Sequence, residues 1–531
     1  MNFTFNLIDE PWIPCILPQG NGTRYLGIAD TLIQARQIKE IHDASPLVTV
    51  SLHRLLLAIL YRAFAPVETK GQWLNLWKRG QFAANRIEAY LSKWRDRFDL
   101  FGESHPFYQT AGLETSRPDT VSRLATEAAS GNNPTLFDHR VDAALVEYSP
   151  ADAARMLVAA QSCALGGGNR HTARMGTDRG ILRPNYADAI LAKDATFWLS
   201  GYTLFQTLML NLARYRAGPR DLPCWERDDP HALMDTVSAR GRRTHPARGS
   251  LDRFTWQSRL VRLLPENRNG SAVVRHLYFA QGRSADKSLD DPMKAYRKSK
   301  QQGILPFSLS PEKAVWRDLH ALLTLERQEG KPPEAVNSAA QMIVDGVLEQ
   351  RYMFQLNVVG LAKKQAKPLL WRHDRMPLPA ALLQDADLIE NLGMRIGEAE
   401  DMATGRWGIR ERLRRVCRFF LAPDSDKPQG RKPHPDDISR LLNNLNPLRV
   451  YWARLEHDFH ELLQHLAAYP DRSRERWRDA VEREARRSFR EACDALGTSA
   501  RAIRAVARVG GGFRIGAPQR ESRKPEETAA L

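Results

Sequence analysis

The sequence predicts an α+β protein, with an irregular mixed α/β N-terminal globular domain followed by a C-terminal antiparallel helical (four-helix) bundle. Its 531 residues exceed what one ordinary core accommodates, so more than one domain is expected. Before residue 370, short apolar runs alternate with Gly, Pro and Asn turns. After Pro377, apolar residues recur at helical spacing. We therefore expect a mixed domain at 1–370, a bundle at 376–508 and a disordered basic tail at 510–531.

The first domain is expected to contain both helices and strands. An apolar, β-prone stretch begins at Phe5 and returns through Tyr25 to Ile28, after a turn at Gly20-Asn-Gly22. Strand-like apolar runs also occur within 256–280. Apolar residues spaced three and four apart predict helices at 51–64, 72–94, 151–161, 198–215 and 312–325.

The second domain is predicted to be helical almost throughout. Asn446-Pro447 is typical of a helix start, because proline is tolerated at the first helical position. A polar Pro/Gly segment at 423–435 is expected to be a linker. Amphipathic helices joined by short polar loops form an antiparallel bundle. They are predicted at 380–396, 409–420, 438–445, 447–466 and 477–496.

The charge balance indicates a polyanionic partner. The chain has 78 Lys+Arg against 62 Asp+Glu, a formal net charge of +16, and nucleic acid is the commonest polyanion. We find no polybasic amphipathic helix with a bulky apolar face, which a membrane surface would favour. The five cysteines form no CxxC pair, the N-terminus lacks a signal-peptide pattern, and no apolar run approaches the ~20 residues that span a bilayer. We expect a cytoplasmic, reduced and soluble protein without a membrane partner.

The basic stretch 360–375 is the first candidate site. It contains one acid, Asp374, one amide, Gln365, and five cations: Lys363, Lys364, Lys367, Arg372 and Arg375. Cations in a loop neutralise phosphates, and an amide among them can reach base edges or push between bases. The alternative is a solvated basic turn at a domain boundary.

Two loops are further candidates. Residues 129–140 are rich in loop formers and carry Phe137, His139 and Arg140, which suit stacking on bases; a surface loop pinned by Phe137 is the alternative. Gly166, Gly167 and Gly168 allow close backbone approach, and their N–H groups can bind phosphate. The stretch is neither a Walker loop nor GxGxxG, so it fits backbone contact with a polymer better than a nucleotide site.

No catalytic constellation emerges from the sequence. His457, His460 and Glu461 share a helix face, with His465 further along, but they lack the HExxH order, and a polar helix face is the simpler interpretation. Cys163 near His171 could be a nucleophile, but a buried structural cysteine is the simpler interpretation. The sequence therefore predicts a non-catalytic binding protein.

Three short motifs carry a family resemblance: 7–14 (LIDEPWIP), 105–109 (HPFYQ) and 130–139 (SGNNPTLFDH). Together with the domain order, they resemble the large subunit (CasA type) of the type I-E CRISPR Cascade complex over roughly residues 5–506. The resemblance implies that a guide RNA reads the target while the protein reads only a short duplex motif, the PAM. It implies minor-groove readout and a glutamine wedge that opens the duplex to start R-loop formation.

The resemblance also implies roles for individual residues. Gln365 matches the wedge, with Lys364 and Ala366 beside it, and Gly166, Gly167 and Gly168 match a glycine loop that approaches the PAM bases. A mobile loop that contacts the guide RNA and neighbouring subunits corresponds to Phe137, Asp138 and His139. The family's minor-groove lysine has three candidates here: Gln281, Arg283 and Lys287. Phosphate contacts are expected from Lys363, Lys367, Arg283 and Lys287.

The partners implied are target double-stranded DNA, the guide-RNA 5′ end, the backbone, 5′-end cap and small subunits, and a helicase–nuclease effector. No cofactor is expected, and no zinc, because the cysteine cluster of some relatives is missing from this sequence. The alternatives are a general RNA/DNA-binding scaffold, or a metal-dependent nuclease built on the His457 cluster.

Overall fold

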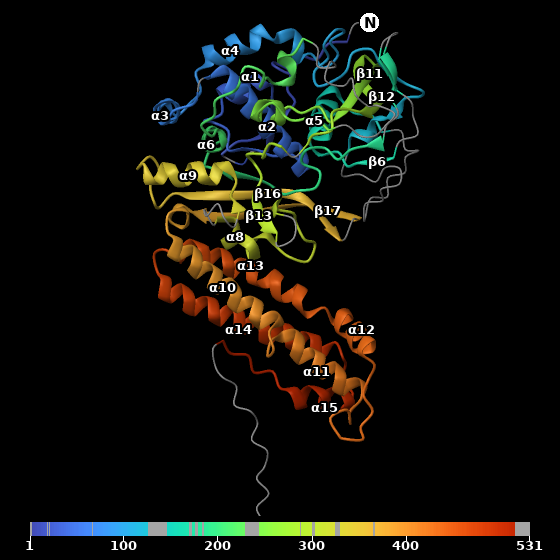
Figure 1. Cartoon of the computed structure of the whole chain (residues 1–531), viewed down its shortest axis with the longest axis vertical. Helices are drawn as coiled ribbons and strands as arrows, with labels where there is room; N and C mark the ends of the chain where they lie inside the picture. The colour runs from blue at the N-terminus through green and yellow to red at the C-terminus, as the bar shows by residue number, and fades with distance from the viewer. Residues whose placement is uncertain are drawn as a thin grey trace, which may run out of the picture. The chain divides into compact units, whose positions relative to one another are not determined.

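The chain forms two compact units in a computed structural model (Figure 1). The first unit comprises Met1–Val315 and Leu322–Gln384, and the second comprises Trp316–Ala321 and Asp385–Leu531. The mixed helices and strands of the first unit and the helices of the second confirm the predicted fold class. The structure describes residues 3–18, 20, 22–65, 67–125, 146–168, 173–175, 179–182, 185–228, 244–286, 288–299, 303–323, 330–364 and 367–515.

The N-terminal hairpin is confirmed. β1 (Ile13–Ile16) pairs antiparallel with β2 (Thr23–Leu26), and β3 (Glu40–Ile41) completes the sheet in the order β2-β1-β3. α1 (Ile28–Ile33) follows β2 directly.

α2 (Pro46–Ala63) is the central helix of the first unit. The Ser45 hydroxyl caps it by accepting the Val48 N–H, and proline occupies its first turn. By length and composition alone α2 could cross a membrane, but 89% of its 18-residue window is buried inside the protein. It is therefore the core helix around which the first unit packs.

The predicted helix at 72–94 is in fact two helices. α3 (Lys70–Arg79) ends at Gly80, whose φ of 68° lies in the left-handed region that favours glycine, and α4 (Ala84–Lys93) follows. The Thr69 side chain and Gln72 form a reciprocal capping box at the start of α3.

The predicted helix at 198–215 is wrong in its first part. Residues Thr196–Ser200 form β10, which pairs with β16 (Met353–Lys364), and α6 (Leu204–Asn211) begins only after Thr203. A short apolar run is compatible with either a buried strand or a buried helix. Here the run forms a strand because it pairs with β16, more than 150 residues later in the chain.

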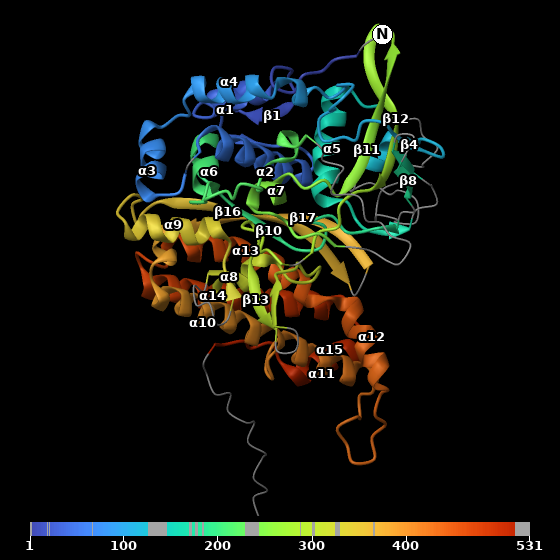
Figure 2. The same ribbon diagram turned by 45° about the horizontal axis from the view of Figure 1, so that its top comes forward.

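A long hairpin projects from the first unit (Figure 2). β11 (Arg259–Arg268) and β12 (Ser271–Gln281) confirm the strands predicted in 256–280. Asn269 and Gly270 turn the chain with φ values of 53° and 83°. The other elements of this unit are β4 (Leu113–Thr115), β5 (Asp119–Thr120), α5 (Pro150–Cys163), β6 (Gly167–Gly168), β7 (Ala173–Met175), β8 (Arg179–Leu182), β9 (Asn185–Tyr186), α7 (Ser250–Phe254), β13 (Tyr296–Ser299), β14 (Gly303–Pro306), β15 (Gly330–Lys331) and α9 (Glu334–Val344).

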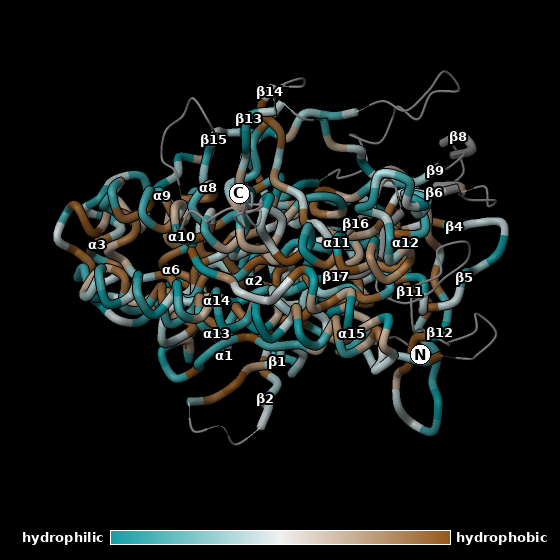
Figure 3. The backbone as a smooth tube through the Cα atoms, turned by 90° about the horizontal axis from the view of Figure 1, so that it is seen from below, coloured by the Kyte–Doolittle hydropathy of each residue, from teal (hydrophilic) through white to brown (hydrophobic). Residues whose placement is uncertain are grey.

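The second unit contains six helices among its described residues, so a bundle of four helices is not confirmed in that detail. Hydrophilic and hydrophobic positions alternate along them (Figure 3), as expected for amphipathic helices. The helices are α10 (Ala386–Thr404), α11 (Ile409–Leu421), α12 (Pro435–Leu445), α13 (Pro447–His465), α14 (Pro470–Asp494) and α15 (Ala500–Val509).

A short segment from the middle of the sequence completes the core of the second unit. Trp316 is 1% exposed, and its ring stacks on Phe459 with centroids 4.5 Å apart. It also meets the rings of Trp452 and Trp477 edge to face. The segment Trp316–Ala321 includes the start of α8 (Leu319–Leu323), which begins later than the helix predicted at 312–325.

The predicted domain limits need two corrections. The division falls between Gln384 and Asp385, because residues 370–376 lie inside a strand of the first unit. The predicted start of the disordered tail, residue 510, is also too early. Phe513 is 1% exposed and packs edge to face on Phe489. Residues after Ile515 lie outside the described part of the chain.

Candidate nucleic-acid interface

The basic stretch 360–375 is a β-hairpin rather than a loop. β16 (Met353–Lys364) and β17 (Lys367–Pro379) pair antiparallel from Met353↔Pro379 to Lys364↔Lys367, with an irregularity between Ala362 and Lys363. β10 pairs with β16 on its other side, in the order β10-β16-β17. The chain therefore holds its basic residues at the end of a long, anchored ribbon.

The register brings three lysines to the hairpin end. Lys364 faces Lys367, and Lys363 faces Pro368. Gln365 and Ala366 connect the two strands in sequence and lie outside the described residues. Backbone pairing thus brings the predicted cations at 363, 364 and 367 to one end of the hairpin, next in sequence to the predicted wedge.

The two arginines of this stretch have structural roles instead. The Arg372 guanidinium donates to the carbonyls of Ser310 and Lys313 and to Asp374, at 3.0, 3.1 and 2.6 Å. Arg375 pairs with Glu40 at 3.0 Å. Arg372 and Arg375 are thus each paired with an acid of the protein. The candidate DNA contacts of this stretch are therefore the three lysines at the hairpin end.

His373 on β17 and His53 on α2 both pack against Trp198, with ring centroids 5.4 and 5.5 Å away. Burial lowers the pKa of His373 to about 4, assisted by Arg375, and burial also lowers the pKa of His53. Both imidazoles are therefore held neutral in the folded protein.

Acid is expected to destabilise the first unit through these histidines. Below the ordinary histidine pKa of about 6.5 the unfolded chain binds protons that folded His373 does not, so stability is lost as pH falls from 6.5 to about 4. Replacing His373 with glutamine should flatten the fall of Tm across this window. The exposed His465, replaced by glutamine, should leave the slope unchanged; equal slopes for wild type and His373→Gln would contradict the assignment.

The glycine stretch forms a second backbone feature. Gly167 and Gly168 form β6, paired with Tyr186 and Asn185 of β9. The Gly166 N–H donates to the Asp188 carboxylate at 2.9 Å, and a Cβ there would lie 2.9 Å from the Tyr186 carbonyl oxygen. A Cβ on Gly167 would meet nothing within 4 Å. Gly166 is thus required by packing, while Gly167 presents open backbone, and β6 lies toward the same side of the first unit as the hairpin end (Figure 1).

The structure contradicts the phosphate contact predicted for Arg283. Its side chain is 3% exposed, donates to Asp252 at 2.8 Å and lies 3.6 Å over the Trp256 ring. Gln281 is also buried, and its side-chain oxygen accepts the Ala187 N–H at 2.6 Å. A neutralised, buried guanidinium cannot reach a nucleic acid. Lys287 and the predicted mobile-loop residues Phe137, Asp138 and His139 lie outside the described residues.

Within the described ranges, the side chains named for a catalytic or metal site do not form such a site. No group of three or more His, Cys, Asp or Glu side chains there could hold a metal ion. His457 lies 3.6 Å from Glu461 as an exposed pair. The five cysteines are buried and form no disulfide; Cys163 packs with its Sγ 4.0 Å from the Ser51 hydroxyl oxygen, and His171 lies outside the described residues.

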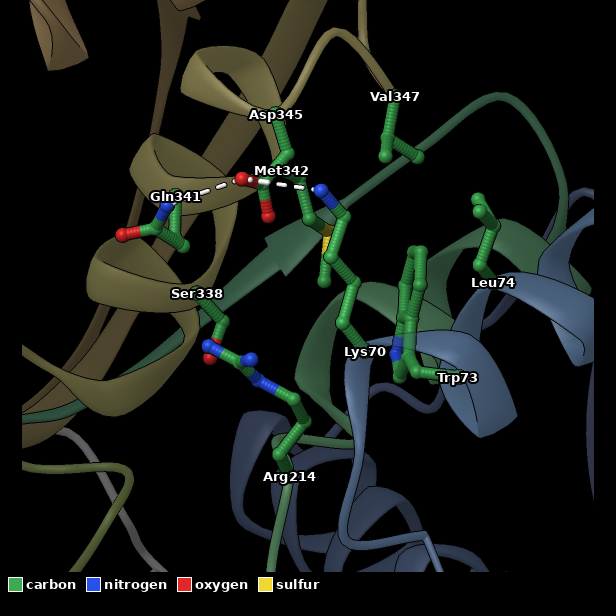
Figure 4. A pocket seen from close by; sticks show the side chains of 9 residues that line it. All are labelled: Lys70, Trp73, Leu74, Arg214, Ser338, Gln341, Met342, Asp345 and Val347. Carbon is green, nitrogen blue, oxygen red and sulfur yellow. Dashed lines mark hydrogen bonds and ion pairs between the residues drawn. The ribbon is translucent and has the colours of Figure 1, made fainter.

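A pocket between α3 and α9 does not extend the interface (Figure 4). Trp73 and Met342 supply apolar walls, and Lys70 reaches Asp345, with Nζ 3.1 Å from Oδ1. Asp345 also accepts from Gln341 at 3.2 Å. The lysine here is already neutralised by the protein's own acid.

Comparisons with known proteins now define the class. Residues 6–488 match the family described as CRISPR-associated protein Cse1. A CRISPR-associated protein CasA/Cse1 of Thermus thermophilus is 35% identical over 507 residues, 95% of each chain. A crystal structure of Thermus thermophilus CasA matches with a TM-score of 0.77 at 32% identity, covering 95% of this chain and 98% of that one. A chain from the structure of a CRISPR RNA-guided surveillance complex shares the fold, with a TM-score of 0.71 at 20% identity, covering 95% of this chain and 98% of that one.

The fold is therefore that of a CRISPR-associated protein. The chain belongs to the Cse1 family, which confirms the resemblance seen in the sequence. The names of the matching family and of the Thermus relative denote no catalytic activity. The sequence predicted that Arg283, Arg372 and Arg375 belong to the basic contact surface. In the structure, each of these arginines is paired with an acid of the protein.

Proposed function

We propose that this chain is the non-catalytic large subunit of a crRNA-guided surveillance complex. It recognises the PAM in target double-stranded DNA from the minor groove and opens the duplex to start R-loop formation. The observation that carries the proposal is the hairpin end, where Lys364 faces Lys367 across the two-residue connection Gln365-Ala366. Membership of the Cse1 family supports it.

The hairpin suits a wedge for a mechanical reason. Two paired strands of 12 and 13 residues, with β10 alongside β16, resist bending better than a free loop. The wedge must offset the stacking of one base-pair step, about 1–2 kcal/mol. Charge-assisted contacts from Lys363, Lys364 and Lys367 to phosphates could supply that energy.

Opening of the duplex should depend on Gln365. We expect Gln365→Ala in the reconstituted complex to reduce R-loop formation on PAM-bearing DNA, with little change in affinity for plain duplex, since the lysines remain. Binding and strand opening should be measured at one fixed salt concentration on PAM-bearing and PAM-scrambled duplexes.

Gln37→Ala, a change at an exposed glutamine after α1, is the matched control and should behave as wild type. If Gln365→Ala opens DNA normally and scrambled duplex binds equally well, the chain is a general RNA/DNA-binding scaffold. The net charge of +16 is the observation that favours this second candidate.

Two neighbouring glycines should give opposite phenotypes. Gly166→Ala places a Cβ 2.9 Å from the Tyr186 carbonyl and should lower Tm. Gly167→Ala meets no atom within 4 Å, so Tm should stay within about 1 °C of wild type, while affinity for PAM-bearing duplex falls because the Cβ blocks close backbone approach. Thermal denaturation and duplex binding measured on both variants check this. Unchanged PAM binding by Gly167→Ala would remove β6 from the interface.

The remaining partners follow from the same proposal. Phe137, Asp138 and His139 would contact the guide-RNA 5′ end and the backbone and 5′-end cap subunits. The helical unit would face the small subunits, and the assembled chain would recruit the helicase–nuclease in the cytoplasm. Pull-down of each partner with wild type and with Phe137→Ala tests the first assignment; unchanged guide-RNA crosslinking in that variant would contradict it.

A further inference from the structure

A pocket lies in the first unit beside the motif His105-Pro-Phe-Tyr-Gln109, which the proposed DNA interface does not use. Its empty space, including the opening to solvent, is about 380 Å³. Arg97, His105, Tyr108, Ala111, Arg227 and Gln257 are among the residues that line it. Two arginines and a histidine thus line one small concavity.

The wall of this pocket is held in an unusual conformation. Tyr108 has a φ of 56°, which is rare for a residue with a bulky side chain. Gln161 fixes it by donating to the Tyr108 carbonyl at 3.0 Å, and Gln109 ties the loop to Leu263 and Leu100 at 2.8 and 2.6 Å. Strained backbone persists only where its surroundings over-determine it, and such positions cluster at ligand sites.

The interior behind the pocket carries more positive than negative charge among directly paired groups. Asp252 is the only carboxylate in the described residues that pairs with Arg227 and Arg283, at 2.6 and 2.8 Å. The three side chains are 9%, 3% and 1% exposed for Arg227, Arg283 and Asp252. Asp221 is buried nearby, but its carboxylate accepts backbone N–H groups of 251 and 252 and the Tyr215 hydroxyl rather than a guanidinium.

Of the two arginines that pair with Asp252, Arg227 is the one that lines the pocket. Its hydrogen bonds to described residues come from Nη2, to Asp252 and to the Leu222 carbonyl at 2.7 Å, while Nε is buried without a partner. Arg97 donates to the Arg227 carbonyl at 3.1 Å and is 13% exposed. Arg97 pairs with Asp96 at 3.6 Å and with Asp228 at 3.4 Å, but these acids are 75% and 97% exposed, so water screens both pairs.

We infer that this pocket binds a small oxyanion, of the size of inorganic phosphate or a carboxylate group, between Arg97 and Arg227. A guanidinium presents several N–H donors in a fixed plane that matches the oxygens of such groups. An anion there would give Arg227 a counter-charge of its own, because Arg227 shares Asp252 with Arg283. The site is separate in sequence and chemistry from the hairpin and the glycine strand, so it stands or falls independently of the proposed DNA binding.

Full-length protein titrated with sodium phosphate, and separately with sodium acetate, against sodium chloride at equal ionic strength tests the inference. We expect a saturable rise in Tm with at least one oxyanion and none with chloride, because a ligand bound only by the folded state stabilises it. Phosphate alone would indicate a phosphate site, and equal effects of both ions would indicate a carboxylate-type site.

Variants at the pocket test whether the rise in Tm comes from binding there. Ala111→Leu fills the pocket without changing charge, and Arg97→Gln removes a rim cation; each should weaken the apparent affinity at least tenfold. Arg268→Gln removes an arginine that is 57% exposed on the β11–β12 hairpin and should titrate as wild type. No saturable difference from chloride in wild type would overturn the inference, as would equal affinity in Ala111→Leu, Arg97→Gln and wild type.

Discussion

Replacing Trp316 with alanine is expected to remove about 3–5 kcal/mol from the unfolding free energy of the second unit. The indole is 1% exposed and is surrounded by Phe459, Trp452 and Trp477. Truncation leaves a cavity that helices α13 and α14 cannot close without losing their own contacts. Urea denaturation of the full chain, followed by circular dichroism of the helices, measures the loss.

The matched control is Trp407→Ala in the same unit, where the indole is 46% exposed and little burial is lost. Trp316→Phe is the informative intermediate. It retains the stacking on Phe459 and removes an indole N–H that has no hydrogen-bond partner among the described residues, so it should cost much less than alanine. Equal stability of Trp316→Ala and Trp407→Ala would contradict the assigned role.

This tryptophan also marks the limit of prediction from sequence. The helices of the second unit could be predicted because their pattern is local: Leu455, Phe459 and Leu462 recur on one face and are buried. Nothing local indicates that Trp316, some 130 residues earlier in the chain than α13, packs among them. Domain membership of such a segment depends on long-range contacts, and sequence spacing does not record them.

In the candidate interface, too, local features could be predicted from the sequence and long-range contacts could not. The basic residues at 363, 364 and 367 were identifiable by charge, but their placement on a hairpin depends on pairing between strands. A signal was available, because apolar Phe354, Leu356 and Val358 alternate with Gln355 and Asn357, which is the period of a strand. Prolines 368 and 377 favour a loop interpretation and obscure it.

Arginine roles could not be predicted from charge at all. Arg283 finds its carboxylate 31 residues away in Asp252, and Arg54 finds Asp291 237 residues away. An arginine in a sequence has the same charge whether it faces a phosphate or a buried acid. The fold decides, by supplying or withholding a partner.

Asp291→Ala is therefore expected to have the second large effect, a loss of about 3–5 kcal/mol from the first unit. Asp291 is buried and accepts from Arg54 at 2.9 Å and Arg253 at 3.2 Å. These guanidinium groups hold the pKa of its carboxyl well below the ordinary value despite burial. Removing the carboxylate leaves two arginines, 0% and 7% exposed, without their shared counter-charge.

The adjacent Asp290 supplies the control, because it is exposed and its ion pair among the described residues is with the half-exposed Lys331 at 3.2 Å. Asp290→Ala should cost no more than about 1 kcal/mol, as exposed pairs do. Asp291→Asn separates charge from shape: it keeps a side chain that can accept from one arginine, yet it should still lose most of the stability, since the uncompensated charges remain. Near-wild-type stability of Asp291→Asn would mean that Arg54 and Arg253 are held by hydrogen bonds alone. Urea titration of the three variants at pH 7 distinguishes these outcomes, because the Asp291 carboxylate is fully ionised there in the wild-type protein.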